Sequence, residues 1–432
     1  MAAVLSLPEA FRTETPQNSE WRIATGSDDR LLALVPETFA GHQPGATWSP
    51  DGRTVAVSLM TMGKTQHFGI FLFSFSDRSV REFFSTSGWI GRSVWESDGS
   101  ALLTVMEEAS SKSGQLWRIS FPDAQARRIT NGLTHYIGLS DLARDGRTAV
   151  SVTAKFSANL WSVDPASLSP ARQLSDGPAV WDFQEPDDGR LFVLTEDEEL
   201  WTAEPDGSHR ELLSNVHANG FVRCGNATIL RVHRDGQVYF VRLGDDGTHP
   251  TDMVAGRVLS PVCSSNSREM YYVDLTPPQR VMSVGLDGGT PEEVFRVPGD
   301  GFFARLTISN DGRYLAVPFE EYHPSPILRV AIIDTAGAPK PGVPGRTLVL
   351  PAEVYKTGVI EWSPNASAVQ FLLNQNGSTN IWEQPLEGGP PRQVSHFTVG
   401  EIANFHWSAD GKRLYITENN SRSDAVMIRN LP

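Results

Sequence analysis

WSPDGRTVAVS, residues 48–58, has the pattern of a strand end, a tight turn and a second strand. Pro50 presets φ at the second position of a turn, and Asp51 and Gly52 suit the bend that follows. From Thr54 to Ser58 the residues alternate as they do in a strand that buries one face. The stretch therefore predicts two β-strands joined by a short turn.

Variants of this phrase return along the whole 432-residue chain. Six clear copies begin at residues 95, 142, 185, 308, 362 and 407, and two degenerate copies begin at 224 and 265. Neighbouring turn positions are separated by between 37 residues (189 to 226) and 54 residues (312 to 366). Asn tolerates positive φ, whereas Ser and Ala suit this turn less well. The nine turn positions are Gly52, Gly99, Gly146, Gly189, Asn226, Ser267, Gly312, Ala366 and Gly411.

A second phrase follows the first, for example LWRISF from Leu116 and IWEQPLEGG from Ile381. After it comes a short polar-apolar strand such as ARRIT or PRQVS. Each unit is thus four strands long, and four antiparallel strands per ~40–50 residues are typical of a β-propeller blade. The spacing predicts blades arranged around a central channel.

The tryptophans occupy fixed places in this repeat. Four end the first strand of a unit, and five lie in the third strand, where we expect them to pack between neighbouring sheets. Trp89 and Trp181 have no place set by the repeat. The first set is Trp48, Trp95, Trp362 and Trp407, and the second is Trp21, Trp117, Trp161, Trp201 and Trp382.

We therefore expect an all-β fold: a single β-propeller over residues 17–432, after an N-terminal extension at 1–16. Nine units predict nine blades, or eight if a degenerate copy near 219–257 or a terminal piece forms none. The last unit has three strands, and residues 20–35 resemble a third and a fourth strand, so we expect an N-terminal strand to close the ring. The units begin near residues 47, 94, 139, 181, 219, 258, 303, 359 and 402.

Composition and charge exclude several classes of protein. The chain has 37 basic and 51 acidic residues, a net charge of −14, so a duplex or an anionic membrane surface would be repelled. There is no run of about 18 apolar residues, which predicts no membrane span. The first eleven residues lack the charged and apolar regions of a signal peptide. Two cysteines, Cys224 and Cys263, leave one bridge open as an alternative to two unpaired thiols, which the sequence favours.

The two phrases together resemble TolB-like and WD-repeat-like propellers. Residues 115–163 and the ending from Asn380 resemble in particular the C-terminal propellers of bacterial serine/threonine protein kinases and of winged-helix regulators. The resemblance covers about residues 17 to 431. It implies a sensing or interaction domain that is extracytoplasmic when its parent is anchored in a membrane. The chain begins within a repeat, so we expect either an excised part of a longer protein or a stand-alone relative.

Catalytic signatures are missing from the sequence. It has no GxSxG elbow, no HExxH and no P-loop, so we predict no catalytic residue, no metal ligand and no cofactor. The ten histidines show no ligand spacing, although blades could bring several to the axis. Glu196 to Glu199 form the densest acidic run, which we interpret as a solvated turn rather than a calcium site.

The loops that enter each first strand should meet at one mouth of the channel. Their aromatic and polar residues either form a rim for a ligand or cap the core, and the cap is the favoured interpretation. The candidates are Trp89, His135, Tyr136, Trp181, Phe302, Phe303, Tyr355, Lys356, Phe405 and His406.

The predicted function is non-catalytic binding of a protein, a peptide or a small ligand, as the sensor or interaction domain of a bacterial signalling protein. The alternatives are a metal-assisted hydrolase or lyase with an axial site, and an envelope scaffold of TolB type. We expect a soluble monomer with protein or peptide partners, and the sequence leaves its compartment unknown.

Overall fold

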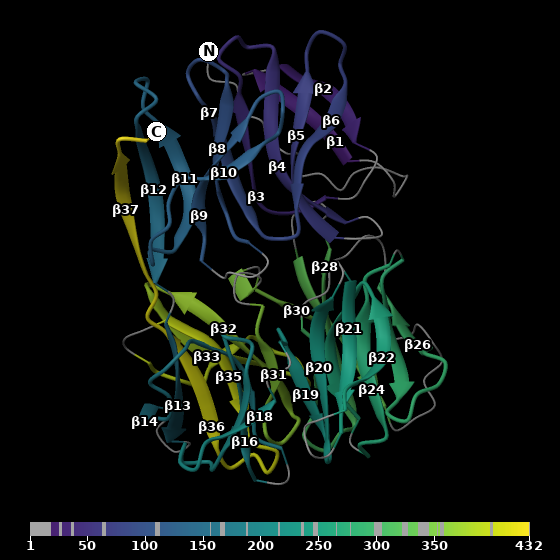
Figure 1. The fold of residues 1–432 in the computed structure, drawn as a ribbon. Helices are drawn as coiled ribbons and strands as arrows, with labels where there is room; N and C mark the ends of the chain where they lie inside the picture. The colour runs from purple at the N-terminus through teal and green to yellow at the C-terminus, as the bar shows by residue number, and fades with distance from the viewer. Residues whose placement is uncertain are drawn as a thin grey trace. The chain divides into compact units, whose positions relative to one another are not determined.

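The computed structural model is all-β. It describes residues 19–25, 28–35, 39–62, 66–108, 113–155, 157–164, 169–186, 189–214, 217–234, 237–244, 249–264, 266–276, 278–297, 305–321, 327–335, 345–351, 353–354, 358–397 and 401–431. These residues form strands β1 to β37 and no α-helix (Figure 1). The chain divides into a first unit, Met1–Lys155 with Ser421–Pro432, and a second unit, Phe156–Asn420.

The second unit contains six antiparallel sheets of four strands each. Sheet I has the order β14-β13-β36-β35, and sheets II to VI each use four consecutive strands. Sheet I consists of β13 (Ala158–Asp164), β14 (Ser169–Gln173), β35 (Glu401–Trp407) and β36 (Leu414–Asn419). Sheet II consists of β15 (Val180–Gln184), β16 (Leu191–Thr195), β17 (Leu200–Ala203) and β18 (Glu211–Ser214). Sheet III consists of β19 (Phe221–Cys224), β20 (Ala227–Arg234), β21 (Gln237–Leu243) and β22 (Thr251–Gly256).

The other three sheets follow in chain order. Sheet IV consists of β23 (Val258–Cys263), β24 (Glu269–Asp274), β25 (Arg280–Gly285) and β26 (Glu292–Arg296). Sheet V consists of β27 (Thr307–Ile308), β28 (Tyr314–Glu321), β29 (Ile327–Asp334) and β30 (Arg346–Leu350). Sheet VI consists of β31 (Ile360–Trp362), β32 (Ala368–Gln375), β33 (Ser378–Pro385) and β34 (Arg392–Gln393).

The six sheets close into a ring. Six hydrophobic clusters each join one sheet to the next, including sheet VI to sheet I through Ile381 and Phe405, and sheet I to sheet II through Leu160 and Val180. Sheets packed face to face around a common axis are the blades of a β-propeller, and burial between them is the main stabilising term. The predicted all-β propeller with four-stranded antiparallel blades is confirmed.

The predicted number of blades needs a correction, because the second unit closes with six sheets and does not form one ring of nine or eight. The closure lies in sheet I, where β13 pairs with β36 from Ala158↔Asn419 to Val163↔Leu414. Repeat spacing gives the number of units but not which strands pair. The sequence therefore could not show that β13 pairs with β36 and not with β12, the strand that precedes it.

The first unit stacks three sheets and contains a separate hairpin. The hairpin joins β1 (Ser19–Thr25) to β2 (Asp28–Val35). Two four-stranded sheets follow, β3 (Phe39–Trp48), β4 (Thr54–Met62), β5 (Gln66–Ser74) and β6 (Val80–Thr86), then β7 (Ile90–Trp95), β8 (Ala101–Met106), β9 (Gln115–Ser120) and β10 (Ala126–Arg128). The third sheet consists of β11 (Tyr136–Leu142), β12 (Thr148–Lys155) and β37 (Arg422–Arg429).

The C-terminal strand belongs to the first unit. β37 pairs with β12 from Thr148↔Arg429 to Lys155↔Arg422, so a yellow strand lies beside a blue one in Figure 1. The expected closure by residues 20–35 is wrong, because β1 and β2 pair with each other and β37 has β12 as its partner. The second unit is thus inserted between two paired strands of the first.

The repeated turn is held by side chains as well as by glycine. The Ser49 hydroxyl donates to Asp51 Oδ1 at 2.6 Å and accepts from the Thr54 amide at 2.9 Å. The same arrangement recurs at Ser309, Ser363 and Ser408. In the last of these turns the serine hydroxyl, first among several hydrogen bonds, lowers the pKa of Asp410 to about 2. The Ser-x-Asp/Asn spacing therefore explains why the phrase repeats.

The degenerate turns follow the same geometry with one exception. Ser267 and Ala366 adopt φ of 52° and 54°, close to the 67° of Gly312. In the degenerate unit that begins at Cys224, we expected the positive φ at Asn226. It is found at Gly225, whose φ is 57°. Glycine adopts this conformation more easily than asparagine does, so the turn moves by one residue.

The tryptophan places are confirmed for the described side chains. β3, β7, β31 and β35 end at Trp48, Trp95, Trp362 and Trp407, and the third strands hold Trp117, Trp161, Trp201 and Trp382. Trp95 and Trp362 are fully buried in the clusters between sheets.

The two cysteines form a disulfide, against the favoured prediction of unpaired thiols. Cys224 ends β19 and Cys263 ends β23, so the bond joins sheets III and IV, with 5.3 Å between the Cα atoms. The residues are 39 positions apart in sequence, and only the packing of adjacent blades brings them together.

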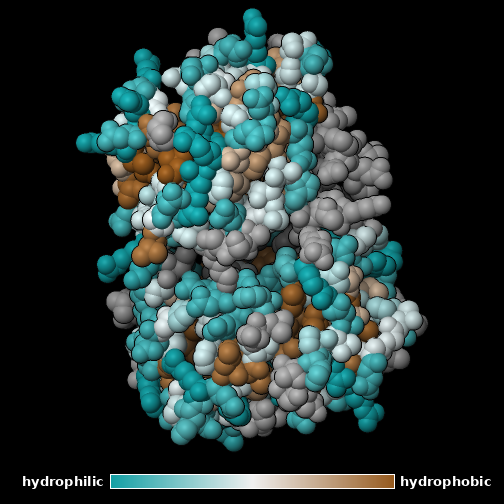
Figure 2. Space-filling model, in the orientation of Figure 1, coloured by the Kyte–Doolittle hydropathy of each residue, from teal (hydrophilic) through white to brown (hydrophobic). Residues whose placement is uncertain are grey.

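Hydrophobic residues lie mostly inside these sheet stacks. On the face drawn in Figure 2, hydrophilic residues surround small hydrophobic patches. Among the described residues, no helix has the length and hydropathy needed to cross a bilayer.

Candidate functional site

Polar residues of the second unit converge on the axis from the innermost strands. They occupy two repeat positions, seven and five residues before the turn, as Asp182 and Gln184 precede Gly189. Residues two apart on a strand share a face, so the two positions of one strand lie on the same side of their sheet. The first position holds Asp182, Ser260, Arg305 and Asn404, and the second holds Gln184, Thr307, Glu361 and His406.

β-Bulges help to aim these side chains. The register shifts between Val180 and Asp182 in β15 and between Ile402 and Asn404 in β35. The residue after each bulge accepts a hydrogen bond from the next amide, 3.0 Å for Asp182 and 2.9 Å for Asn404. Bulges re-aim side chains and often lie beside functional sites. Here they turn a strand residue towards the channel.

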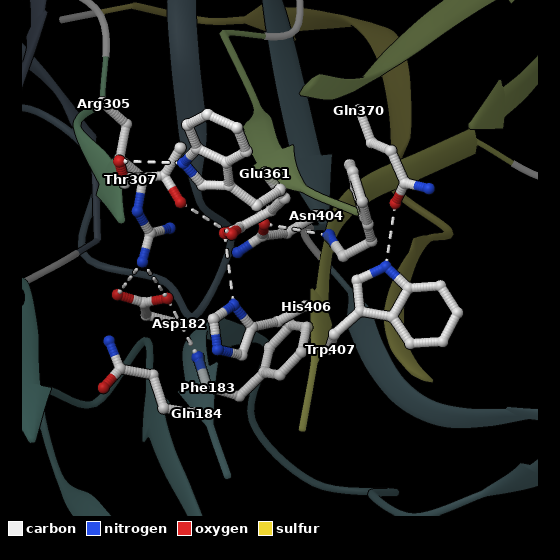
Figure 3. A network of polar contacts seen from close by, with 12 residues as sticks. Asp182, Phe183, Gln184, Arg305, Thr307, Glu361, Gln370, Asn404, His406 and Trp407 are labelled. Atoms are coloured by element: carbon white, nitrogen blue, oxygen red, sulfur yellow. Dashed lines mark hydrogen bonds and ion pairs between the residues drawn. The ribbon is translucent and has the colours of Figure 1, made fainter. Parts of the chain in front are cut away.

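One ion pair crosses the ring. Arg305 Nη2 lies 2.9 Å from Asp182 Oδ1 and 3.0 Å from Oδ2, and the two side chains point at one another in Figure 3. Asp182 belongs to sheet II, and Arg305 directly precedes sheet V, three sheets away in either direction round the ring. The charge of Asp182 raises the pKa of Arg305, while burial opposes that shift. The pair therefore spans the channel.

A second group of contacts joins sheets V, VI and I. Glu361 accepts from the Thr307 hydroxyl at 3.0 Å and lies 3.2 Å from His406 Nδ1 (Figure 3). Burial raises the pKa of Glu361, but His406, Arg305 and Thr307 lower it by more, so the net direction is down. The carboxylate is thus charged at neutral pH, although only 11% of its side chain is exposed.

The remaining innermost strands join this network through single bonds. The Leu306 amide donates to Ser260 Oγ at 2.6 Å, which connects sheets V and IV. Gln184 accepts from the Arg223 amide at 3.1 Å, which connects sheets II and III. Side chains of sheets I, II, IV, V and VI and one backbone amide of sheet III therefore contribute to this group of polar contacts, which we name the axial network.

The axial network brings together a guanidinium, two carboxylates and an imidazole. Such groups form charge-assisted hydrogen bonds, which are short and specific. Within the described ranges, no group of three or more His, Cys, Asp or Glu is placed to hold a metal ion. Among the axial side chains, Arg305 has 33% of its surface exposed and His406 has 28%. These two are more exposed than the carboxylates that they contact, Asp182 at 14% and Glu361 at 11%.

Seven of the predicted rim residues belong to the second unit, and three of these lie within the described residues. Trp181 is the bulge residue of β15, and its side chain is 47% exposed beside Asp182. His406 is part of the axial network. Phe405 is fully buried in the cluster between sheets VI and I, so it serves as core and not as a rim. These three residues lie within strands and not in loops, because β15 and β35 begin earlier than predicted.

The three predicted rim residues of the first unit have partners within that unit. Trp89 and Tyr136 pack against a hydrophobic cluster of the first unit, and His135 Nδ1 accepts from the Gly114 amide at 3.0 Å. Phe302, Phe303, Tyr355 and Lys356 lie outside the described residues. In the acidic run, Glu196 accepts from the Ala179 amide at 3.1 Å.

Sequence reasoning missed Asp182, Arg305 and Glu361. A signal existed, because a charged residue stands at an axis-facing repeat position where a strand could hold an apolar one. The prediction instead selected aromatic residues nearby in the sequence, namely Trp181, Phe303 and Tyr355. Aligning the nine units on their turn residues would have shown the polar positions directly.

Comparison with known proteins gives structural neighbours and no sequence relatives. No protein-family model and no curated protein matches the chain. TolB from Acinetobacter baumannii is 14% identical with a TM-score of 0.27, over 78% of this chain and 61% of that one. The tricorn protease is 10% identical with a TM-score of 0.34, over 85% of this chain and 47% of that one.

A third neighbour is the β-propeller domain of Cps50 (Swd1) from Myceliophteria thermophila. It is 13% identical with a TM-score of 0.35, and the match covers 80% of this chain and 98% of that one. The chain thus spans less than two thirds of TolB and of the tricorn protease. The neighbours include propellers of the predicted TolB and WD-repeat types. The fold assignment itself rests on the strand pairing described above.

Proposed function

We propose that the chain is a non-catalytic binding protein and that the axial network of the second unit holds a segment of a peptide or protein partner. The observation that carries this proposal is the Arg305–Asp182 pair across the channel. Charged side chains are rarely buried unless they are paired, and placing them at the axis costs desolvation energy. An apolar axis would stabilise the ring equally well, so these charges are best explained by recognition.

The surroundings of the pair support a peptide ligand. Trp181 is next to Asp182 in sequence and is half exposed, and aromatic and arginine side chains dominate the binding energy of many interfaces. A partner carboxylate could replace Asp182 on the Arg305 guanidinium, which presents its donors as a planar fork. We place the partner's anchor at this end of β15.

The expected extracytoplasmic position also remains a proposal. Structural disulfides persist mainly in oxidising compartments. The bond between Cys224 and Cys263 supports such a location. The kinase-linked and scaffold roles stay predictions from resemblance.

A peptide-display experiment tests the binding proposal. The full chain is screened against a library of random dodecapeptides, and binders are measured with two charge-neutral double variants. D182N/R305M removes the axial pair without leaving one charge unpaired, and E383Q/R392M removes a similar pair from the outer part of sheet VI. We expect selected peptides to lose about tenfold or more in affinity with the first variant and to keep it with the second.

Two results would contradict the proposal. One is a library that yields no peptide with saturable binding. The other is a set of binders that D182N/R305M leaves unaffected, which would place recognition elsewhere on the molecule.

A further inference from the structure

A cavity lies at the seam between sheet I, within which the ring closes, and sheet II. Its volume is about 150 Å³. Apolar side chains from both sheets line it, and no step of the proposed peptide recognition uses it. The main lining residues are Leu160, Leu174, Val180, Leu191, Val193 and Trp201.

The cavity exists because this seam is the least filled of the six. Its cluster has six buried residues among those whose burial is described, against eight to twelve in the other five. Val193 is only partly buried, although it faces the cluster. Gly177 also borders the space and contributes no side chain to fill it. Packing at ordinary density would need one more side chain here.

The walls are held apart by specific contacts. Gly207 lies so close to sheet I that an added Cβ would be 3.0 Å from the Leu174 carbonyl oxygen. The Arg210 guanidinium donates to the same carbonyl group, and it also lies 3.8 Å from Asp176. These contacts tie the turn before β18 to the end of β14. The seam therefore cannot collapse into the cavity without losing them.

Among the polar residues of the lining, Ser175, Thr195 and Arg210 have hydrogen-bond partners, and Glu199 adds a carboxyl group. Ser175 Oγ accepts from the Leu160 amide at 2.8 Å. Thr195 interacts with the backbone of Glu199, and Arg210 has the contacts just described. Water in this space would find few partners, and apolar cavities of this size stay dry and take up small apolar molecules. An ionised ligand would lose its hydration without compensation.

We propose that this cavity, which we name the seam site, binds an uncharged molecule the size of one aromatic ring. Leucine and valine side chains supply the apolar walls, and the Trp201 indole supplies an aromatic surface against which a ring can pack. The seam site is separate from the axial network, and its ligand stabilises the contact between sheets I and II.

Toluene and benzoate are suitable probes, because both carry one ring and only benzoate is charged. Binding to the full chain is measured by calorimetry and by the shift in melting temperature. Val193→Phe fills the seam site, and Val349→Phe places the same change on the half-exposed outer strand β30. We expect toluene to bind the wild type and V349F with equal affinity, V193F to bind it tenfold or more weakly, and benzoate to bind none of them.

A second measurement does not depend on a folded variant. Crystals of the wild type pressurised with xenon should show one xenon atom between Leu174, Val193 and Trp201. The proposal is overturned if toluene shows no saturable binding, if V193F binds it as well as V349F does, or if xenon avoids the cavity. D182N/R305M should leave toluene binding unchanged, so failure of the axial proposal is separate from failure of this one.

Discussion

At the scale of single residues, the repeat is a hydrogen-bonded turn with one position of positive φ. Glycine fills that position in most units, and the Ser-x-Asp/Asn hydroxyl and carboxyl groups bond the amides around it. Ala366 adopts a φ of 54° at this position. A residue with a Cβ is strained there by roughly 1–2 kcal/mol.

Ala366→Gly should therefore stabilise the protein. Glycine relieves the strain but costs roughly 0.5–1 kcal/mol of additional backbone entropy, so we expect a net gain of about 0.5–1 kcal/mol in the free energy of unfolding. Urea denaturation followed by circular dichroism measures the change.

Gly189→Ala is the matched control for this prediction. Gly189 has a φ of 73°, and among the described residues no atom lies within 4 Å of an added Cβ, so we expect backbone strain to dominate. It should lose about 1 kcal/mol. If both substitutions shift stability in the same direction, the positive φ at Ala366 is not the source of strain.

The axial residues show what sequence could and could not provide at this scale. The turn positions predict where Asp182, Arg305 and Glu361 lie within their repeat units. The Arg305–Asp182 contact depends on how many blades separate the two residues. With nine blades they would not lie opposite one another, so the pair could not be predicted before the ring was counted.

At the scale of strands and sheets, buried polar contacts reinforce the seam between sheets I and II. Glu185 is buried in sheet II with 1% of its side chain exposed. It accepts from Arg413 Nε at 2.8 Å and from the Tyr415 hydroxyl at 2.5 Å; Arg413 directly precedes β36 of sheet I, and Tyr415 lies on it. Burial, followed by the Glu185 hydrogen bond, raises the pKa of Tyr415. These bonds fasten the seam that holds the smallest apolar cluster.

Glu185→Ala should destabilise the second unit by about 3 kcal/mol, because it leaves Arg413 and Tyr415 without their shared acceptor. Glu293→Ala breaks a comparable pair with Arg296, but that arginine is 52% exposed, so the cost should stay below about 1 kcal/mol. Thermal unfolding of both variants provides the measurement. Equal losses in the two variants would show that the seam does not depend on Glu185.

Strand order was predictable from sequence because each blade is local. Alternation and turn residues placed the first, second and third strands, and the tryptophans marked their ends. The partners of β12 and β13 were not predictable, because many strands of the repeat share the same alternating pattern. Any of them could pair with β12 or β13 as far as the sequence shows. Local propensity describes a strand but does not choose between two equivalent neighbours.

At the scale of the whole molecule, the second unit contains everything that its ring needs. All six sheets and the closing pair lie within 157–420, and the ends of that segment are adjacent, with the Asn420 amide donating to the Ser157 carbonyl oxygen at 2.8 Å. Termini that lie close together are usual for a domain that folds alone.

A fragment of residues 157–420 should therefore fold by itself. We expect one cooperative thermal transition and a β-rich circular dichroism spectrum. A fragment of residues 175–420, which lacks β13 and β14, is the control and should lose cooperativity. A disordered 157–420 fragment would mean that its ring requires the rest of the chain.

The pairing of β13 with β36 also determines how long one strand edge stays unpaired during synthesis. Ala158 emerges from the ribosome 261 residues before its partner Asn419 (419 − 158). At a translation rate of about 5–20 residues per second, β13 remains without its partner strand β36 for roughly 13–50 seconds. β12 waits slightly longer, because its partner β37 comes last. During translation the nascent chain therefore carries two open strand edges, and chaperones that shield such edges should matter most in this interval.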